Sequence, residues 1–96
     1  MATILTTEGE MIDIGHNPLL DVMQKAVRGY IEYVPLPEEV QATTGFAYLY
    51  CNEEGKLMGL PPNVLATLLA FGDTPHDIIV GDVVLCKENE EGEEEE

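Results

Sequence analysis

Residues 46–63, FAYLYCNEEGKLMGLPPN, carry the strongest structural pattern in the sequence. In an extended strand successive side chains point to opposite faces, so Phe46, Tyr48 and Tyr50 share one face of the run FAYLYC. The residues between them, which share the other face, are also apolar. A strand with two apolar faces is covered on both sides, so this pattern predicts the centre of a sheet.

A polar turn follows the predicted strand. The four residues NEEG, 52–55, end in glycine, which accepts positive φ without a Cβ clash in a type I turn with a bulge. The run KLMGL, residues 56–60, then predicts the return arm of a β-hairpin. Pro61 and Pro62 end that arm, because proline has no N–H group with which to extend a strand ladder.

The N-terminal part predicts a second hairpin and a helix. Residues 3–14 have two β-prone arms around a Glu-Gly pair. Asn17 suits a helix N-cap and Pro18 suits the first helical position. Residues 18–28 have apolar side chains at spacings of three and four, as in a helix with one face against a sheet. Gly29 then predicts a left-handed C-terminal cap.

The next segment predicts an edge strand and a loop. Residues 30–34, YIEYV, are β-branched and aromatic, as is typical of a strand. Pro35 and Pro37 place this strand at the edge of the sheet. The polar run PEEVQATTG, residues 37–45, predicts a surface loop that crosses to the central strand.

The C-terminal half predicts a second helix and the closing strands. Asn63 suits the N-cap of a helix over residues 64–71, VLATLLAF. This helix has so little polar surface that we expect it to be buried between the sheet and a second layer, for which a second subunit is one candidate. Residues 78–80 and 83–86 are strand-like, and the Gly-Asp pair between them predicts a tight turn or a bulge.

Together these elements predict an α+β domain over residues 1–87. We expect a small mixed, mostly antiparallel sheet of five to six strands with two helices, in the approximate order ββαβββαβ. Residues 88–96, ENEEGEEEE, have no apolar side chain to bury and repel one another, which predicts a disordered acidic tail. No apolar run reaches the length of a membrane span and no export signal is visible, so we expect a cytoplasmic protein.

The charge balance limits the choice of partners. The chain has 19 acidic and 4 basic residues, a formal net charge of −15. Residues 1–87 alone hold twelve acidic and four basic residues, which leaves −8. We expect no nucleic-acid or membrane partner, because binding to phosphates and anionic lipids depends on clustered Lys and Arg. An acidic protein fits a basic surface of another protein, although a purely solubilising charge is the alternative.

Neither the cysteines nor the histidines indicate a metal site. Cys51 and Cys86 lie in apolar, strand-like surroundings, which favour buried thiols in a reducing cytoplasm; a disulfide between them is the alternative. His16 and His76 form no close pair with either cysteine, as zinc sites require. We therefore expect no metal and no cofactor.

The sequence also lacks the usual marks of catalysis. It contains no serine, no Gly-rich phosphate loop and no nucleophile motif. The adjacent glutamates, at 38–39 and 53–54, fall in a predicted loop and a predicted turn, where water solvates them and where catalytic carboxylates are not typical. We expect no catalytic residue and no enzyme activity.

The predicted turn contains a candidate ligand site. Polar groups of Asn52, Lys56 and Asn63 could converge on one rim, with Tyr48 or Tyr50 as a flat apolar surface. The candidate binding residues are Tyr48, Tyr50, Asn52, Glu53, Glu54, Lys56 and Asn63. The competing interpretation is structural: the asparagines shape the turn and cap the helix, and the tyrosines belong to the core.

Four short motifs give the sequence a family resemblance. They are GYIE at 29–32, NEEGK at 52–56, LPPN at 60–63 and DIIVGD at 77–82. This pattern resembles a family of small domains of unknown function carried mainly by phages, plasmids and bacteria. The resemblance covers residues 4–86, while the long acidic tail departs from the family pattern. It implies a mobile-element origin and a shared fold, and it supplies no catalytic residue.

Charge and resemblance together indicate a function. We expect a non-enzymatic phage or mobile-element accessory protein that binds and inhibits a host protein with a basic surface, for example in counter-defence. One alternative is a sequestering protein for a small signalling ligand, and a second is a structural or assembly accessory protein. A homodimer through the apolar helix stays open.

Overall fold

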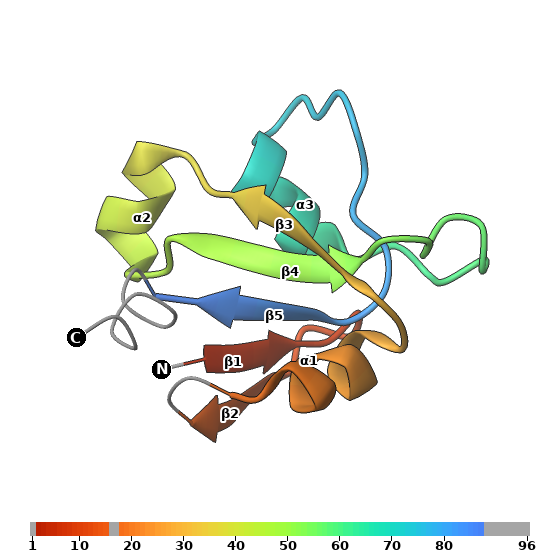
Figure 1. Ribbon diagram of the computed structural model, residues 1–96. Helices are drawn as coiled ribbons and strands as arrows, with labels where there is room; N and C mark the ends of the chain where they lie inside the picture. The colour runs from red at the N-terminus through yellow and green to blue at the C-terminus, as the bar shows by residue number, and fades with distance from the viewer. Residues whose placement is uncertain (1, 16–17, 88–96) are drawn as a thin grey trace.

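The computed structural model describes residues 2–15 and 18–87 (Figure 1). The elements follow one another as β1 (Ala2–Leu5), β2 (Met11–Gly15), α1 (Leu20–Val27), β3 (Ile31–Pro35), α2 (Glu38–Thr44), β4 (Tyr48–Asn52), α3 (Val64–Phe71) and β5 (Val83–Cys86). The predictions about Asn17 as a helix cap, about His16 and about the tail at residues 88–96 lie outside the described residues. Within the described ranges no helix is long and apolar enough to cross a bilayer.

One five-stranded sheet, in the order β2-β1-β5-β4-β3, organises the fold. Every neighbouring pair in it is antiparallel. The predicted α+β class and strand number are confirmed, whereas the described strands are purely antiparallel rather than mixed. The strand predicted to be central, β4, has a neighbour on each side but is not the middle strand of the sheet, which is β5.

The two edge strands, β2 and β3, form where the sequence predicts them. The N-terminal hairpin forms as predicted, with Leu5 of β1 opposite Met11 of β2. The hydroxyl of Thr6 accepts the N–H group of Glu10 at 3.0 Å and so closes the turn. On the far side β3 is an edge strand as predicted, and Pro35 stands at its last position, where a missing N–H group is tolerated.

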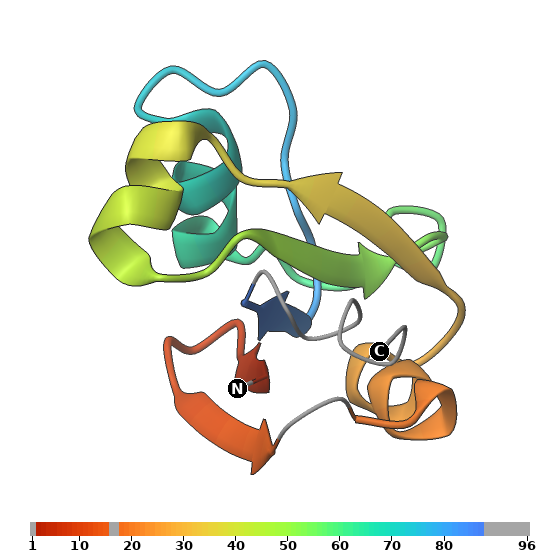
Figure 2. The same ribbon diagram turned by 60° about the vertical axis from the view of Figure 1, so that its left-hand side comes forward.

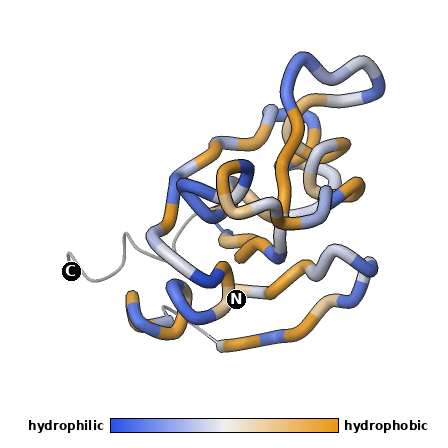
Figure 3. The backbone as a smooth tube through the Cα atoms, turned by 90° about the vertical axis from the view of Figure 1, so that its right-hand side faces the viewer, coloured by the Kyte–Doolittle hydropathy of each residue, from blue (hydrophilic) through white to orange (hydrophobic). Residues whose placement is uncertain are grey.

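The sheet buries both of its faces, each under a different helix (Figure 2). Leu49 and Cys51 of β4 pack on the face covered by α3. Tyr48 and Tyr50 of the same strand pack on the other face, together with Val27 of α1. The predicted alternation is therefore confirmed for residues 48–51. It is wrong for Phe46 and Ala47, which precede β4: Phe46 packs against the cluster of Leu49 and Cys51, and Ala47 against that of Tyr48. Hydrophobic and hydrophilic stretches alternate along the backbone in Figure 3.

The predicted loop at residues 37–45 is wrong, because residues 38–44 form helix α2. Pro37 precedes the helix, and Glu38 and Glu39 in its first turn complement the positive end of the helix dipole. Gly45 ends it in the left-handed region, with φ at 84°. Val40 packs against the core and anchors the helix. Pro37 and Gly45 are the start and stop signals of this helix in the sequence, although the polar, threonine-rich composition between them is typical of a loop.

The predicted return arm at residues 56–60 is also wrong. Residues 53–59 form consecutive turns instead, in which the N–H group of Met58 donates to the carbonyl of Glu54 at 3.0 Å. A local hairpin has no room, because β3 and β5 already occupy both edges of β4. Residues 78–80 form no strand beside β5, because β1 and β4 already occupy both edges of β5. Val80 makes only an isolated bridge with Pro62.

The two predicted helices form with different accuracy. Helix α3 has the predicted bounds, and the side chain of Asn63 accepts the N–H group of Ala66 at 3.1 Å, as a cap should. Helix α1 begins at Leu20 rather than Pro18, and Arg28 rather than Gly29 takes the left-handed cap, with φ at 70°. Glycine suits position 29 for a different reason: a Cβ atom there would lie 2.8 Å from Nδ2 of Asn52.

Candidate functional site

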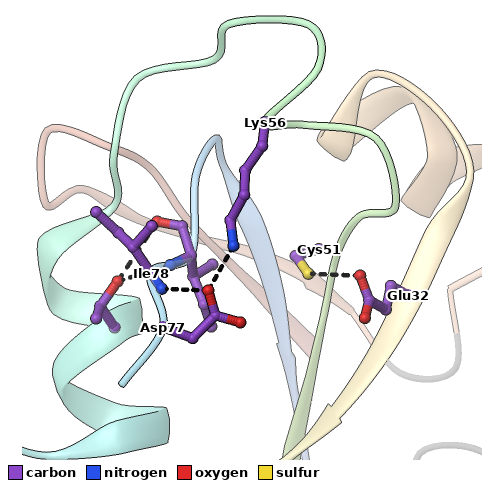
Figure 4. Close-up of polar contacts among 7 residues, drawn as sticks. Glu32, Cys51, Lys56, Asp77 and Ile78 are labelled. Atoms are coloured by element: carbon purple, nitrogen blue, oxygen red, sulfur yellow. Dashed lines mark hydrogen bonds and ion pairs between the residues drawn. The ribbon is translucent and has the colours of Figure 1, made fainter. Parts of the chain in front are cut away.

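A cavity of about 240 Å³ opens where the turn after β4 meets the segment before β5. It lies on the α3 side of the sheet (Figure 4). The polar residues around it are Glu32, Cys51, Asn52, Glu53, Glu54, Lys56 and Asp77. Among the described residues that line the cavity, Lys56 is the single cation against four carboxylates. The cavity therefore favours positively charged groups.

The thiol of Cys51 forms part of this cavity and faces a carboxylate. Cys51 of β4 pairs with Glu32 of β3 across the strands, and its sulfur lies 4.0 Å from Oε1 of Glu32. Burial and, to a smaller extent, the charge of Glu32 raise the pKa of Cys51 to about 11. A thiol with this pKa stays protonated at neutral pH, so it is a poor nucleophile.

An ion pair closes one side of the cavity. Lys56 of the turn reaches the carboxylate of Asp77, 21 residues further along the chain (Figure 4). Asp77 also accepts the N–H group of Ile78 at 2.7 Å. The hydrogen bonds from Lys56 and Ile78 hold the pKa of Asp77 below its ordinary value. Both charged side chains are about half exposed, so water screens the pair, and its role is to pin the turn.

The two asparagines of the predicted site are engaged inside the fold. Asn52 is buried; its amide nitrogen donates to the carbonyl of Val27 at 2.8 Å, and its oxygen accepts the N–H group of Glu54 at 2.7 Å. Asn63 is 1% exposed and donates to the carbonyls of Leu5 and Gly81, each at 3.0 Å. Both side chains fix the ends of elements.

The two tyrosines of the predicted site lie on the other face of the sheet. With Tyr33 they form an aromatic cluster, in which the ring centroids are 5.1 to 6.1 Å apart. Because strand side chains alternate, Tyr48 and Tyr50 cannot share a rim with the cavity beside Cys51. The structure therefore brings Asn52, Glu53, Glu54 and Lys56 together around one cavity and separates them from Asn63 and from the tyrosines.

A second cavity, of about 360 Å³, lies at the tip of the N-terminal hairpin. Glu8, Glu10 and Asp82 line it together with Arg28, the one non-glycine residue with positive φ among the described residues. A carboxylate oxygen of Asp82 accepts the N–H group of Thr7 at 3.0 Å, which joins segments 75 residues apart. No local pattern in the sequence predicts this cavity, because four separate segments build it.

The exposed charge of the described residues is strongly negative. Eleven of their twelve acidic side chains are exposed, and Asp82 is half-buried. Of the four cations, Lys56 is paired with Asp77, and Lys25 and Arg28 lie at the end of α1. Lys87 lies 5.8 Å from the ring centroid of Phe46. The cations are thus dispersed, and they form no basic patch within the described residues.

Among the described residues, helix α3 is covered on one side only, so this chain supplies no second layer over it, and burial against a second subunit stays a prediction. Ala66, Thr67 and Ala70 face the core. Val64, Leu65 and Leu68 are 63%, 45% and 42% exposed. The described structure therefore leaves an aliphatic helix face in contact with solvent.

The described residues give no sign of a metal centre: none of their His, Cys, Asp and Glu side chains gather in groups of three or more that could hold an ion. Cys51 and Cys86 are both buried thiols and belong to the cores on opposite faces of the sheet. The alternative of a disulfide between them is therefore wrong, since a disulfide needs adjacent Cβ atoms that point toward each other.

The fold and its cavities define a small antiparallel α+β domain with an acidic surface. The model of a family of domains of unknown function, DUF3846, matches residues 1–96. The chain belongs to this family. The expected membership of a family of unknown function is confirmed, while the phage or plasmid origin stays a prediction. None of the curated proteins or solved structures compared with the chain matches it.

Proposed function

We propose that the chain is a non-enzymatic binding protein that occupies a basic surface of a partner protein. We further propose that a phage or another mobile element carries it, and that it inhibits a host protein in the host cytoplasm. The observation that carries this proposal is the exposure of eleven acidic side chains among the described residues, with cations too dispersed to offset them.

The charge acts mainly on the rate of encounter. The described residues carry a net charge of −8 on a fold whose radius of gyration is 12.5 Å. Such a field attracts a basic surface and raises the association rate constant by about 10- to 1,000-fold at low ionic strength. Seven further glutamates in residues 88–96 add to the negative charge. Inhibition then follows from occupying a surface that the partner uses for an anionic substrate.

The chemistry of the cavities supports binding rather than catalysis. The raised pKa of Cys51 favours the protonated thiol over a nucleophilic thiolate. Lys56 is held by Asp77, and the other carboxylates of that cavity are exposed. Two buried thiols also suit a reducing compartment such as the cytoplasm.

The second candidate function is sequestration of a small ligand in the cavity beside Cys51. The four carboxylates around this cavity favour a cationic ligand. An anionic signalling nucleotide fits less well, because Lys56 and Arg28 line different cavities. Native mass spectrometry of protein purified from its own host tests this candidate: a bound small molecule supports it, and an empty chain contradicts it.

Salt dependence of partner capture tests the first candidate. The full chain, fused to an affinity tag, is incubated with lysate of the native bacterial host at about 50 mM and about 500 mM salt, which spans the range from weak to strong screening. We expect basic partners that are retained at low salt and released at high salt. A variant with Glu8→Gln and Glu10→Gln, which removes two exposed carboxylates, should retain them less. Retention that ignores both salt and these substitutions would contradict the proposal.

A further inference from the structure

Helix α3 exposes only aliphatic side chains to solvent. Its exposed residues are Val64, Leu65 and Leu68, and its one polar residue, Thr67, is buried with its hydroxyl bonded to the carbonyl of Asn63 at 2.9 Å. A helix at a protein surface normally has polar residues on its outer face. The outer face of α3 has the character of an interface instead.

The N-terminal hairpin extends this aliphatic face. A Cβ atom added at Gly9, in the hairpin turn, would lie 3.7 Å from Cδ1 of Leu65, so the turn lies against the helix. Met11 stands opposite Leu5, which belongs to the core under α3, and it is 59% exposed. We call the surface formed by Met11, Val64, Leu65 and Leu68 the α3 patch.

Acidic side chains border the α3 patch on the hairpin side. Glu8 and Glu10 flank the turn residue Gly9 and are exposed. Asp13 lies two residues beyond Met11 on β2, and strand alternation places both side chains on the same face. A partner that covers the patch therefore meets apolar surface at the centre and negative charge at this border.

We infer that the α3 patch is the docking site for a segment of the partner protein with an apolar centre and flanking Lys or Arg residues. The inference rests on the proposed function and names the face and the chemistry that it uses. Aliphatic or aromatic anchors of the segment bury the patch, and its cations pair with Glu8, Glu10 and Asp13. Charge complementarity selects this occupant.

Two other occupants fit the patch less well. A second copy of this chain would bring its own Glu8, Glu10 and Asp13 to the contact. Its described residues also carry a net charge of −8, so the two copies would repel each other. Residues 88–96 of the same chain contain no apolar side chain with which to cover the patch. If either of these occupied the patch, the peptide-binding and light-scattering results would differ from those expected for a basic segment.

A designed peptide serves as the probe. It is a fluorescent amphipathic helix with leucines on one face and lysines on the other, and its anisotropy is titrated with the full chain. Two controls have the same length: one scrambles the sequence so that no apolar face forms, and one replaces lysine by glutamate. We expect the first peptide to bind at least tenfold more tightly than either control. Equal affinity for the scrambled peptide would overturn the inference.

Matched protein variants locate the binding. Val64→Ser with Leu68→Gln removes apolar surface from the α3 patch at exposed positions. Leu20→Gln removes a 55% exposed leucine from α1, on the other side of the sheet, and serves as the control. Circular dichroism melts verify that both variants fold. We expect the patch variant to bind the peptide at least tenfold more weakly and the control to bind like the wild-type chain.

The outcomes separate the two proposals. If salt weakens peptide binding but the patch variant binds like the wild-type chain, this inference fails. The proposed function, binding of a basic partner through the acidic surface (the acidic-surface function), then stands. If the patch variant loses binding while salt and the lysine-to-glutamate control have no effect, the basic partner and the proposed function both fail. A dimer in light scattering that Val64→Ser with Leu68→Gln dissociates would also overturn the inference, because a second copy would then be the occupant.

Discussion

Asn63 donates a hydrogen bond from its side-chain amide to the backbone carbonyl of Leu5, 58 residues earlier in the chain, at 3.0 Å. The same amide donates to Gly81, and its oxygen caps α3 at Ala66. One buried side chain thus fixes the start of α3 against the ends of two segments. The position of the α3 patch relative to the hairpin depends on this residue.

The first prediction concerns this junction. Asn63→Ala removes the cap and leaves two buried carbonyls without their donor, so we expect it to lower the free energy of unfolding by about 2–4 kcal/mol. Asn63→Ser keeps an oxygen that can cap the helix and should lower it by less. Urea denaturation monitored by circular dichroism measures both. An alanine variant within about 0.5 kcal/mol of the wild-type chain would contradict this role for Asn63.

The second prediction concerns Gly29 and Asn52. A Cβ atom at position 29 would lie 2.8 Å from Nδ2 of Asn52, which is held in place by its bond to the carbonyl of Val27. We expect Gly29→Ala to destabilise the fold by about 1–3 kcal/mol through this clash. Asn52→Ala removes the clashing group, so the double variant should be more stable than the sum of the single effects predicts. Strict additivity in the urea-denaturation cycle would exclude the contact as the cause.

These residues also show how far the sequence determined the structure. The alternation in residues 48–51 and the apolar run from Val64 to Phe71, capped by Asn63, are local patterns, and both form as predicted. Phe46 and Ala47 depart from the predicted alternation because they lie before the start of β4. The return arm at residues 56–60 failed because the partners of β4 are β3 and β5, which local turn chemistry cannot reveal. The sequence predicts a loop rather than α2 because the polar, threonine-rich composition of residues 37–45 is typical of a surface loop, although Pro37 and Gly45 mark the two ends of a helix.

The candidate site was predicted only in part, for the same physical reason. Asn52, Glu53, Glu54 and Lys56 do line one cavity. Glu32 and the thiol of Cys51 reach that cavity through the pairing of β3 with β4, which depends on strand register. The predicted site places Tyr48 and Tyr50 beside the turn because they are close to it in sequence, although strand periodicity puts them on a different face from Cys51. Register and long-range pairing are the information that a single sequence lacks.

The third prediction is a pH effect from Cys51. Its pKa in the folded chain is about 11, above the ordinary thiol value of 9.0. The folded state therefore holds this proton more tightly than the unfolded state does, and its stabilising effect is complete below pH 9 and lost as the pH rises toward 11. We expect stability to fall across this window more steeply in the wild-type chain than in Cys51→Ala. Parallel pH profiles of the two chains would contradict the raised pKa.

The fourth prediction concerns the ion pair between Lys56 and Asp77. Because the pair is largely exposed, we expect Lys56→Gln to leave the global unfolding midpoint nearly unchanged. Local opening of the turn at residues 53–59 should become more frequent, since the pair pins it to the segment before Ile78. Hydrogen exchange of the Met58 and Leu60 amides, whose bonds close this turn, measures the opening. Unchanged exchange at these amides would show that the pair does not hold the turn.

The ionic-strength dependence of association tests the acidic-surface function most directly. Once a partner is captured from the host, stopped-flow mixing with the full chain gives the association rate constant from about 50 to 500 mM salt, a range over which the Debye length shrinks severalfold. We expect this rate constant to fall at least tenfold while the dissociation rate constant changes far less. An association rate constant that is the same at both salt concentrations would contradict the acidic-surface function.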